Sequence, residues 1–375
     1  MLPVVFLPGV MGSRLFWKDF SSRTWDPDSL REMKTWILEG ARGGMRLADA
    51  MNYIVNVRVI KQRGDVRGDR IERGWGGVSK NYYYPLLEQV EAEGYEAYAL
   101  GYDWRQNMLT QVDFVLDRLE EFGVERFDLV THSMGGLLAR AVLQQTPQFA
   151  ERVRAAVHLC QPCLGAVVLY RRIFTGCQTG LDGDGLVDKF FCTILGRDGR
   201  QFITNVCGLP GAMQLLPSAE YRSDDDRPLR GYAGEPADFV REIYGNAEQP
   251  PGLTPPNPTP YVRLQLQETI AWVEEFQQAV RDSFFPNAWY VVGDSLETDV
   301  AISEDNSPVR RAAGDGTVPA TSAAALRAQQ ATLSEMAANP GTIRVAQHPG
   351  LEHSTAAADP DVIKTVIAIL NFANG

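Results

Sequence analysis

The stretch from residue 127 to residue 142 joins an apolar strand pattern directly to a helix pattern. It reads Phe-Asp-Leu-Val-Thr-His-Ser-Met-Gly-Gly-Leu-Leu-Ala-Arg-Ala-Val. A serine on such a corner exposes its hydroxyl at the edge of a sheet and faces the N-terminus of the following helix. Gly135 and Gly136 supply the small residues that the corner needs, while Thr131 replaces a usual glycine. The pattern predicts Ser133 as a nucleophile; the alternative is an ordinary strand-loop-helix junction with a capping serine.

A nucleophile of this kind is followed along the chain by a carboxylate and then by a histidine. Three histidines follow Ser133: His158, His348 and His353. His158 lies in an apolar run that predicts a central strand, so we expect it to be a packed core residue. The other two flank a short loop before a closing helix expected at about residues 361–372. We predict His353 as the base, because it comes just ahead of that helix, with His348 as the alternative.

The expected acid lies in the run Gly-Asp-Gly-Thr-Val-Pro, residues 314–319. Asp315 stands between two glycines that let the backbone turn its carboxylate toward the imidazole, where it would fix the tautomer and stabilise the imidazolium. Asp294 is the rival, because it directly follows the strand predicted at 288–293, and Asp299 is a third candidate. We predict Asp315 as the acid.

Stabilising an oxyanion requires two backbone N–H groups, one after the nucleophile and one from a loop after an earlier strand. Met134 supplies the first. The apolar strand predicted at residues 4–7 is followed by Pro-Gly-Val-Met-Gly-Ser, whose glycines allow a tight turn. The amide of Val10 in this turn is therefore the predicted second donor, although the same residues also suit a plain strand-turn.

Strand and helix signals alternate along the chain, which favours a mostly parallel sheet with helices on both faces. The signals predict strands at residues 56–60, 95–102, 153–159, 288–293 and 342–346, and helices at 82–93, 108–122, 263–284 and 361–372. The alternation fails after residue 163, where glycines, prolines and charges accumulate. We therefore predict a mostly parallel α/β core at residues 1–163 and 286–375, with an inserted cap or lid at 164–285.

Composition agrees with a globular enzyme, since 45% of the 375 residues are hydrophobic and 22% are charged. The formal net charge of -11 argues against nucleic-acid binding and against attraction to anionic lipid surfaces, which leaves at most transient contact with a lipid surface. The chain has no apolar run long enough to span a bilayer. Its first residues lack the basic start and cleavage site of a signal peptide, so a cytoplasmic location is expected, although a trimmed secreted form would look the same.

The five cysteines do not predict a metal or redox site. Cys160 and Cys163 form a C-x-x-C pair, but no second pair follows, and the residues between them suit a loop after a strand. Cys177, Cys192 and Cys207 are equally spaced without similar sequences between them, which leaves a disulfide among them open. We expect neither a metal ion nor an organic cofactor.

Aromatic residues gather in the first quarter of the chain, and such side chains suit the rims of apolar pockets. Trp75, between Gly74 and Gly76, is the predicted mobile residue at the substrate rim. Asp103 and Arg105 are expected to pair with each other and to brace the serine corner rather than to take part in chemistry.

Several motifs together resemble the lecithin:cholesterol acyltransferase-like family of α/β-hydrolases, which includes lysosomal phospholipase A. They are the Pro-Gly-Val-Met-Gly-Ser start, Gly-Tyr-Asp-Trp-Arg at 101–105, His-Ser-Met-Gly-Gly, Gly-Asp-Gly-Thr-Val-Pro and Glu-His-Ser at 352–354. Between about residues 164 and 285 the resemblance is limited to 208–217, which looks like a family lid segment. The resemblance implies an α/β-hydrolase fold and a lipid-like acyl ester as substrate. Some lipid-acting members carry an acidic residue where Val10 stands, so only backbone assistance to the oxyanion is expected here.

The sequence thus predicts a serine esterase, lipase or O-acyltransferase that forms an acyl-enzyme on Ser133. Two alternatives remain. The fold could serve as a non-catalytic binding protein, or the same residues could cleave amides or thioesters.

Overall fold

Seven parallel strands form the central sheet of the protein. This computed structural model describes residues 1–17, 23–29, 31, 33, 54–56, 67–178, 186–206, 208–222, 260–301, 310–324 and 330–375. The strand order is β11 (Gln330–Thr332), β12 (Val345–His348), β8 (Ala288–Gly293), β7 (Val153–Leu159), β6 (Phe127–His132), β1 (Val4–Leu7) and β5 (Ala97–Ala99). Parallel neighbours need crossover connections, which accounts for the helices between successive strands.

The alternation of side chains along the strands divides the core into two layers. Val5 and Leu7 of β1 share one layer with α4 (Val112–Glu121), α5 (Met134–Gln145) and α12 (Pro260–Val280). Val4 and Phe6 point the other way and pack with α3 (Lys80–Ala92), α14 (Leu333–Ala338) and α15 (Pro360–Asn374). The predicted arrangement of helices on both faces is therefore confirmed.

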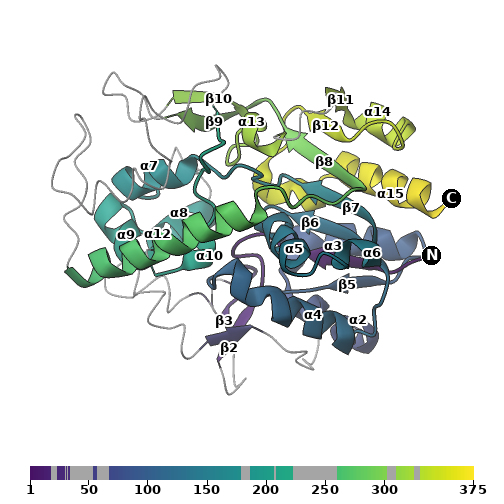
Figure 1. Ribbon diagram of the computed structural model, residues 1–375, viewed down its shortest axis with the longest axis horizontal. Helices are drawn as coiled ribbons and strands as arrows, with labels where there is room; N and C mark the ends of the chain where they lie inside the picture. Colours follow the sequence, from purple (N-terminus) through teal and green to yellow (C-terminus); the bar gives the residue numbers. More distant parts are fainter. Residues whose placement is uncertain are drawn as a thin grey trace.

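Most helices between β7 and β8 lie away from the sheet, on the side opposite both chain ends (Figure 1). They are α7 (Val168–Thr175), α8 (Leu186–Leu195), α9 (Gly199–Val206) and α10 (Pro210–Met213), followed by α12, which returns to pack on α5. These helices fall within the predicted insertion at 164–285, whose limits as a domain stay a prediction. No helix in the described residues is long and apolar enough to cross a bilayer.

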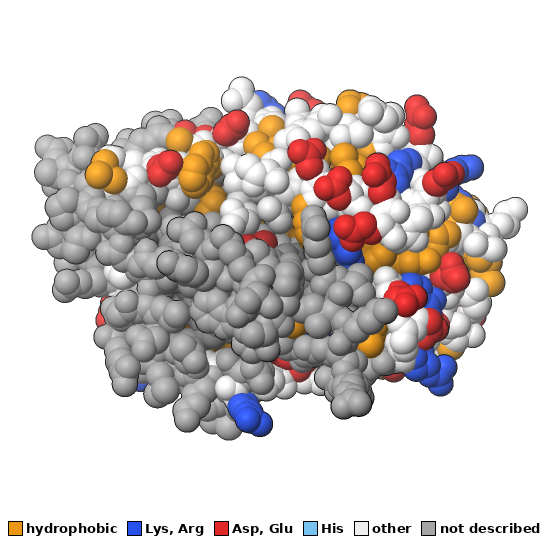
Figure 2. All heavy atoms as spheres, turned by 90° about the horizontal axis from the view of Figure 1, so that it is seen from below, with side chains coloured by type: hydrophobic (Ala, Val, Ile, Leu, Met, Phe, Trp, Pro, Cys, Tyr) orange, Lys and Arg blue, Asp and Glu red, His pale blue; other side chains and the backbone are white. Residues whose placement is uncertain are grey.

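Shorter elements surround this core. A second sheet contains β2 (Leu15–Trp17), β3 (Arg23–Trp25) and β4 (Ile54–Asn56), and β9 (Leu296–Ala301) forms a hairpin with β10 (Arg310–Gly314). The remaining helices are α2 (Gly68–Glu72), α6 (Phe149–Arg152) and α13 (Ala320–Ala323), and the 3-10 helices are η1 (Trp75–Gly77), η2 (Met108–Gln111) and η3 (His353–Ala358). On the face in Figure 2, acidic side chains are spread among small apolar areas of the described surface.

The strands predicted at 153–159 and 288–293 match β7 and β8. The strand predicted at 342–346 begins later, at Val345, because Thr342 and Ile343 donate backbone hydrogen bonds to Asn339 in a turn. Of the strand predicted at 56–60, only Asn56 is among the described residues, as the last residue of β4.

Two carboxylates, the buried Asp299 and the partly buried Asp28, tie distant segments to the core. Asp299 of β9 pairs with Arg171 of α7 at 2.8 Å and with Arg311 of β10 at 3.0 Å. Asp28 accepts hydrogen bonds from the backbone N–H groups of Lys80 and Asn81, and so caps α3 from another part of the chain. The first contact joins the insertion to the β9–β10 hairpin, and the second fixes the start of α3.

Candidate active site

Ser133 occupies the corner between β6 and α5, as predicted. Its φ of 52° and ψ of -124° lie where non-glycine residues are rarely found, and the surrounding structure must hold this strained backbone in place. A Cβ atom at Gly135 would lie 2.5 Å from the carbonyl oxygen of Leu7 and 2.6 Å from that of Pro8. The helix therefore packs against the first strand at a distance that only glycine permits.

Three side chains from distant parts of the sequence meet at this corner. Ser133 Oγ lies 2.9 Å from Nε2 of His353, and Nδ1 of His353 lies 2.8 Å from Oδ2 of Asp315. A carboxylate only accepts hydrogen bonds, so Nδ1 carries the proton and donates it to Asp315. Nε2 is then free to accept from the serine hydroxyl. A hydroxyl, an imidazole and a carboxylate in this order can activate serine for attack on a carbonyl carbon.

Asp315 is held as an anion by its surroundings. Burial by itself would raise the pKa of this carboxyl, but attraction to His353 and the hydrogen bonds that it accepts together lower the pKa. Two of these bonds come from the backbone N–H groups of Thr317, at 2.9 Å, and Val318, at 2.6 Å. The bend after Asp315 thus supplies the donors that stabilise its charge.

The rival candidates lie in other environments. His348 Nδ1 is 2.9 Å from the carbonyl oxygen of Pro349, and Asp299 is bound by arginines. His158 is buried and lies 2.8 Å from the hydroxyl of Thr131; burial, followed by the charge of Arg140, lowers its pKa to about 3. The core position predicted for His158 is confirmed. Nδ1 of His353 is hydrogen-bonded to Asp315, so Asp294 is not the carboxylate that orients this imidazole.

The turn after β1 lies directly against the serine. A Cβ atom at Gly9 would lie 3.0 Å from Cβ of Ser133. The turn is closed by a hydrogen bond from the N–H of Gly12 to the carbonyl of Gly9, at 3.1 Å. Val10 lines the cavity beside Ser133, and Met134 is the first residue of α5, where N–H groups have no partner within the helix. Both predicted oxyanion donors therefore lie next to the serine.

The Tyr-Asp-Trp-Arg run supports this turn and the neighbouring insertion. Tyr102 donates its hydroxyl to the carbonyl of Pro8 at 3.0 Å. Arg105 donates to both carboxylate oxygens of Asp103, at 2.8 and 2.7 Å, which confirms the predicted pair. The carbonyl of Arg105 accepts from Gly211 of α10. Of residues 208–217, which resembled a family lid segment, 209–217 are buried in this packing.

A cavity of about 550 Å³ opens over Ser133 and His353. Its apolar lining comes from the first turn, the residues after β3, α3, α8 and the start of β9. It includes Val10, Met11, Pro27, Tyr82, Tyr83, Phe191, Leu195 and Leu296. Besides Asp315, its charged groups are Arg172, Glu297 and Glu352. Such a mixture, mostly apolar with a few polar groups near the reactive atoms, is typical of a small-molecule site.

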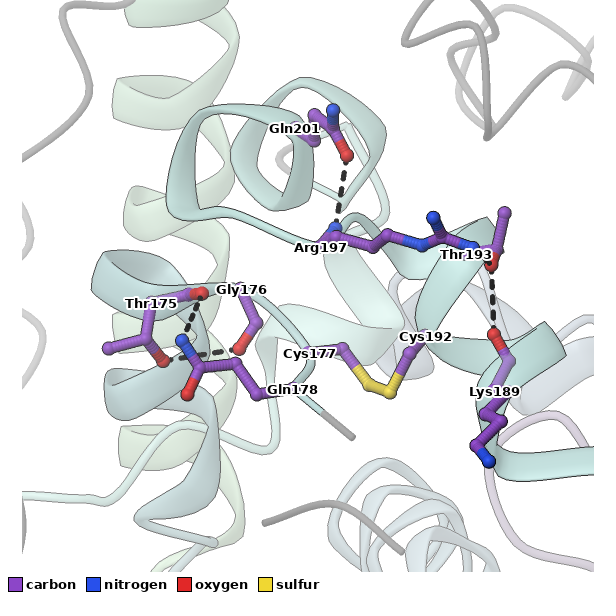
Figure 3. Close-up of a disulfide and its surroundings, with 9 residues drawn as sticks. All are labelled: Thr175, Gly176, Cys177, Gln178, Lys189, Cys192, Thr193, Arg197 and Gln201. Carbon is purple, nitrogen blue, oxygen red and sulfur yellow. Dashed lines mark hydrogen bonds between the residues drawn. A yellow bond between two sulfur atoms is a disulfide. The ribbon is translucent and has the colours of Figure 1, made fainter. Parts of the chain in front are cut away.

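A disulfide joins Cys177 to Cys192 (Figure 3), and Cys177 lines the cavity. This bond joins the residue shortly after α7 to α8, which carries Phe191 and Leu195. The sequence left this pairing open because the spacing alone does not select partners. Cys160 and Cys163 are free and buried, and Cys207 lies outside the described residues.

Cys160, Asp315 and His353 form the one group of metal-ligating side chains found among the described residues, with ligand atoms within 4.8 Å of one another. Burial and the nearby Asp315 raise the pKa of the Cys160 thiol well above its ordinary value. A metal ion is bound by the thiolate rather than the thiol. The site therefore favours the protonated cysteine and the Asp315–His353 hydrogen bond over a metal.

The prediction that Trp75 is a mobile rim residue is wrong. The indole is fully buried, donates to the carbonyl of Ala97 at 2.8 Å and packs edge-on against Tyr84. The flanking glycines fit a short 3-10 turn against the sheet and do not free the side chain. Tyr82 and Tyr83, on the adjacent helix α3, line the cavity instead.

Residues 75–217 match the model of a family described as lecithin:cholesterol acyltransferase. The predicted resemblance to this family is confirmed. The segment that matches lecithin:cholesterol acyltransferase contains the Tyr-Asp-Trp-Arg run and Ser133, whereas Asp315 and His353 lie beyond it. The match supports a hydrolase or acyltransferase in general terms.

A solved structure shows a similar fold. The structure of the Tle4-Tli4 complex is similar with a TM-score of 0.69 and 19% identity, covering 99% of this chain and 98% of that chain. Bacillus licheniformis lipase BlEst2 in mature form covers all of this chain and 91% of its own, with a TM-score of 0.34 and 12% identity. No curated protein matches the chain. The predicted α/β-hydrolase fold is confirmed.

Replacing Gly135 with alanine is expected to lower the free energy of unfolding by about 1–3 kcal/mol or more, because the added carbon collides with two backbone oxygens that cannot move alone. Urea unfolding measures this change. Gly68→Ala is the matched control, since nothing lies within 4 Å of the added carbon there. Equal stability of both variants would show that the helix and the first strand separate easily.

Proposed function

We propose that the protein is a serine esterase or O-acyltransferase that acts on carboxylic, lipid-like esters through an acyl-enzyme on Ser133. The observation that carries the proposal is the pair of hydrogen bonds that joins Ser133, His353 and Asp315, at 2.9 and 2.8 Å, at the base of an apolar cavity. The family match over residues 75–217 supports the same class of reaction.

The reaction would proceed in two steps. His353 removes the proton of Ser133, and the serine oxygen attacks the acyl carbonyl carbon while Asp315 stabilises the imidazolium. The amides of Val10 and Met134 donate to the oxyanion. His353 then protonates the leaving alcohol, and water or a second alcohol, deprotonated by His353, releases the acyl group from the serine.

The cavity lining supports an apolar acyl chain as the part of the substrate that is recognised. Aromatic and aliphatic side chains from α3 and α8 surround the serine, and burying each methylene group contributes about 0.8 kcal/mol. The charged groups at the cavity include the carboxylates of Glu297 and Glu352 as well as Arg172. The apolar chain, rather than net charge, would therefore drive binding.

A substrate panel with purified wild-type protein tests the proposal. We expect p-nitrophenyl octanoate to be cleaved with a kcat/KM about tenfold or more above that of the acetate, because more methylene groups are buried. Phospholipid vesicles and the matching p-nitroanilides complete the panel, and an added long-chain alcohol reveals acyl transfer. Faster cleavage of the anilide would indicate an amidase. No turnover and no labelling by a fluorophosphonate would indicate a binding protein.

A further inference from the structure

A line of buried hydrogen bonds lies behind the candidate site and involves none of its three reactive side chains. The N–H of Gly9 donates to the hydroxyl oxygen of Tyr83 at 3.2 Å. That oxygen is 3.3 Å from Nδ1 of His132, and Nε2 of His132 is 2.8 Å from the carbonyl oxygen of His353. The line therefore connects the first turn, helix α3, the serine corner and the loop that carries His353.

The chemistry of the partners fixes the direction of every bond. The carbonyl of His353 only accepts, so Nε2 of His132 must carry the proton. Nδ1 of the neutral ring is then an acceptor, and the hydroxyl of Tyr83 donates to it. The Tyr83 oxygen in turn accepts from Gly9. All groups in the line are thus satisfied with a neutral imidazole at His132.

The burial of the two rings agrees with this assignment. Tyr83 and His132 are both buried, and desolvation, followed by repulsion from His353, lowers the pKa of His132 to about 3. The neighbouring glycines fit the rings closely. A Cβ atom at Gly9 would lie 2.8 Å from Nδ1 of His132, and one at Gly12 would collide with the Tyr83 hydroxyl. The first turn therefore rests directly on both rings.

Three residues of the line are adjacent in sequence to, or identical with, residues that the proposed reaction uses. Gly9 precedes Val10, His132 precedes Ser133, and the bonded carbonyl belongs to His353 itself. The backbone N–H of His353 is also held, because it donates to the carbonyl of Asp315 at 3.0 Å. His353 is thus fixed through its backbone on both sides, independently of its side chain.

We propose that His132 and Tyr83 are positioning residues that lock the oxyanion turn, the nucleophile and the base into one arrangement. This inference rests on the proposed esterase or acyltransferase function. Neither residue touches the reacting atoms, yet substituting either should lower kcat by more than the accompanying loss of stability explains. A displacement of about 1 Å in such a site lowers the rate by about a hundredfold.

The test compares variants that differ only in the bond removed. Tyr83→Phe keeps the ring and loses the hydroxyl. Its matched control is Tyr84→Phe on the same helix, α3, which removes a buried hydroxyl that donates to the carbonyl of Trp75 in η1. His132→Gln can still place an N–H near the carbonyl of His353, whereas His132→Asn is too short to do so. His158→Gln is the control for loss of a buried neutral histidine.

The readouts are kcat on a p-nitrophenyl ester, the Kd of a non-cleavable ether analogue and Tm. We expect Tyr83→Phe and His132→Asn to lower kcat about ten- to hundredfold with Kd unchanged. We expect His132→Gln to regain most of the rate, and both controls to stay within about threefold of wild type despite similar losses in Tm. The double variant Tyr83→Phe with His132→Asn should be little slower than either single variant, because both break one line.

Two results would overturn the inference while leaving the proposed function intact. One is a kcat for Tyr83→Phe equal to that of Tyr84→Phe in an active wild-type background. The other is an equal loss for His132→Gln and His132→Asn when both are folded. An inactive wild-type protein that is not labelled by a fluorophosphonate would instead reject the proposed function, and the inference with it.

Discussion

Ser133→Ala is expected to lower kcat on esters by about 10⁶-fold and to abolish labelling by a fluorophosphonate. Alanine removes the oxygen that would form the acyl-enzyme, while the small side chain fits the strained corner between β6 and α5. The turn of Val10 and the amide of Met134 remain, so the variant should still bind an ester analogue. Initial rates and intact-protein mass spectrometry measure both effects.

Ser354→Ala is the matched control for this substitution, because Ser354 lines the same cavity and directly follows His353. Its hydroxyl contacts Glu352 at 3.4 Å and lies outside the hydrogen-bonded line to Asp315. We expect this variant to be labelled and to stay within about threefold of the wild-type rate. Retained labelling of Ser133→Ala would show that another residue is the nucleophile.

Asp315→Asn is expected to lower kcat by about 10⁴-fold, the loss seen when a triad carboxylate becomes an amide. An amide can present its N–H to Nδ1 of His353 and so favour the wrong tautomer, in which Nε2 carries the proton and cannot accept from Ser133. Asp294→Asn is the control, since Asp294 directly follows the central strand β8 and was the rival candidate for the acid. A comparable loss in both variants would reject the assignment of Asp315.

The same substitution changes how stability depends on pH. The pKa of Asp315 is lowered in the folded protein from its ordinary value of 3.8, so the unfolded chain binds this proton more readily. The carboxylate therefore stabilises the fold at neutral pH, and this contribution is lost as the pH falls below 3.8 through the lowered pKa. Urea unfolding of Asp315→Asn should lack this part of the acid sensitivity.

Much of the fold was predictable because short stretches of sequence indicated its individual strands and helices. Residues 153–159 and 288–293 are mainly apolar, as expected for strands buried on both faces, and they form β7 and β8. The glycines after Ser133 indicated the tight corner between strand and helix. The chain order of serine, acid and histidine then left only a few candidates, from which Asp315 and His353 were predicted. These features depend on residues close in sequence or on a fixed chain order.

Features that depend on packing between distant segments were not predictable. The glycines around Trp75 suggested mobility, yet the indole fills a gap beside β5. The β9–β10 hairpin pairs strands whose sequences show no regular alternation, and the pair of Asp299 with Arg171 becomes visible only in the fold. For His132, the position just before Ser133 was the one available signal, and nothing in the sequence links it to Tyr83.

The Cys177–Cys192 bridge makes the shape of the substrate cavity depend on where the protein resides. It closes a span of 15 residues, and a loop of that size contributes about 3 kcal/mol to stability when its thiols are joined. Glutathione keeps such thiols reduced in the cytosol, whereas exported proteins retain the bond. In a cytoplasmic enzyme, helix α8, which carries Phe191, would therefore not be covalently linked to Cys177. In an exported enzyme the disulfide would hold this helix in place beside the cavity.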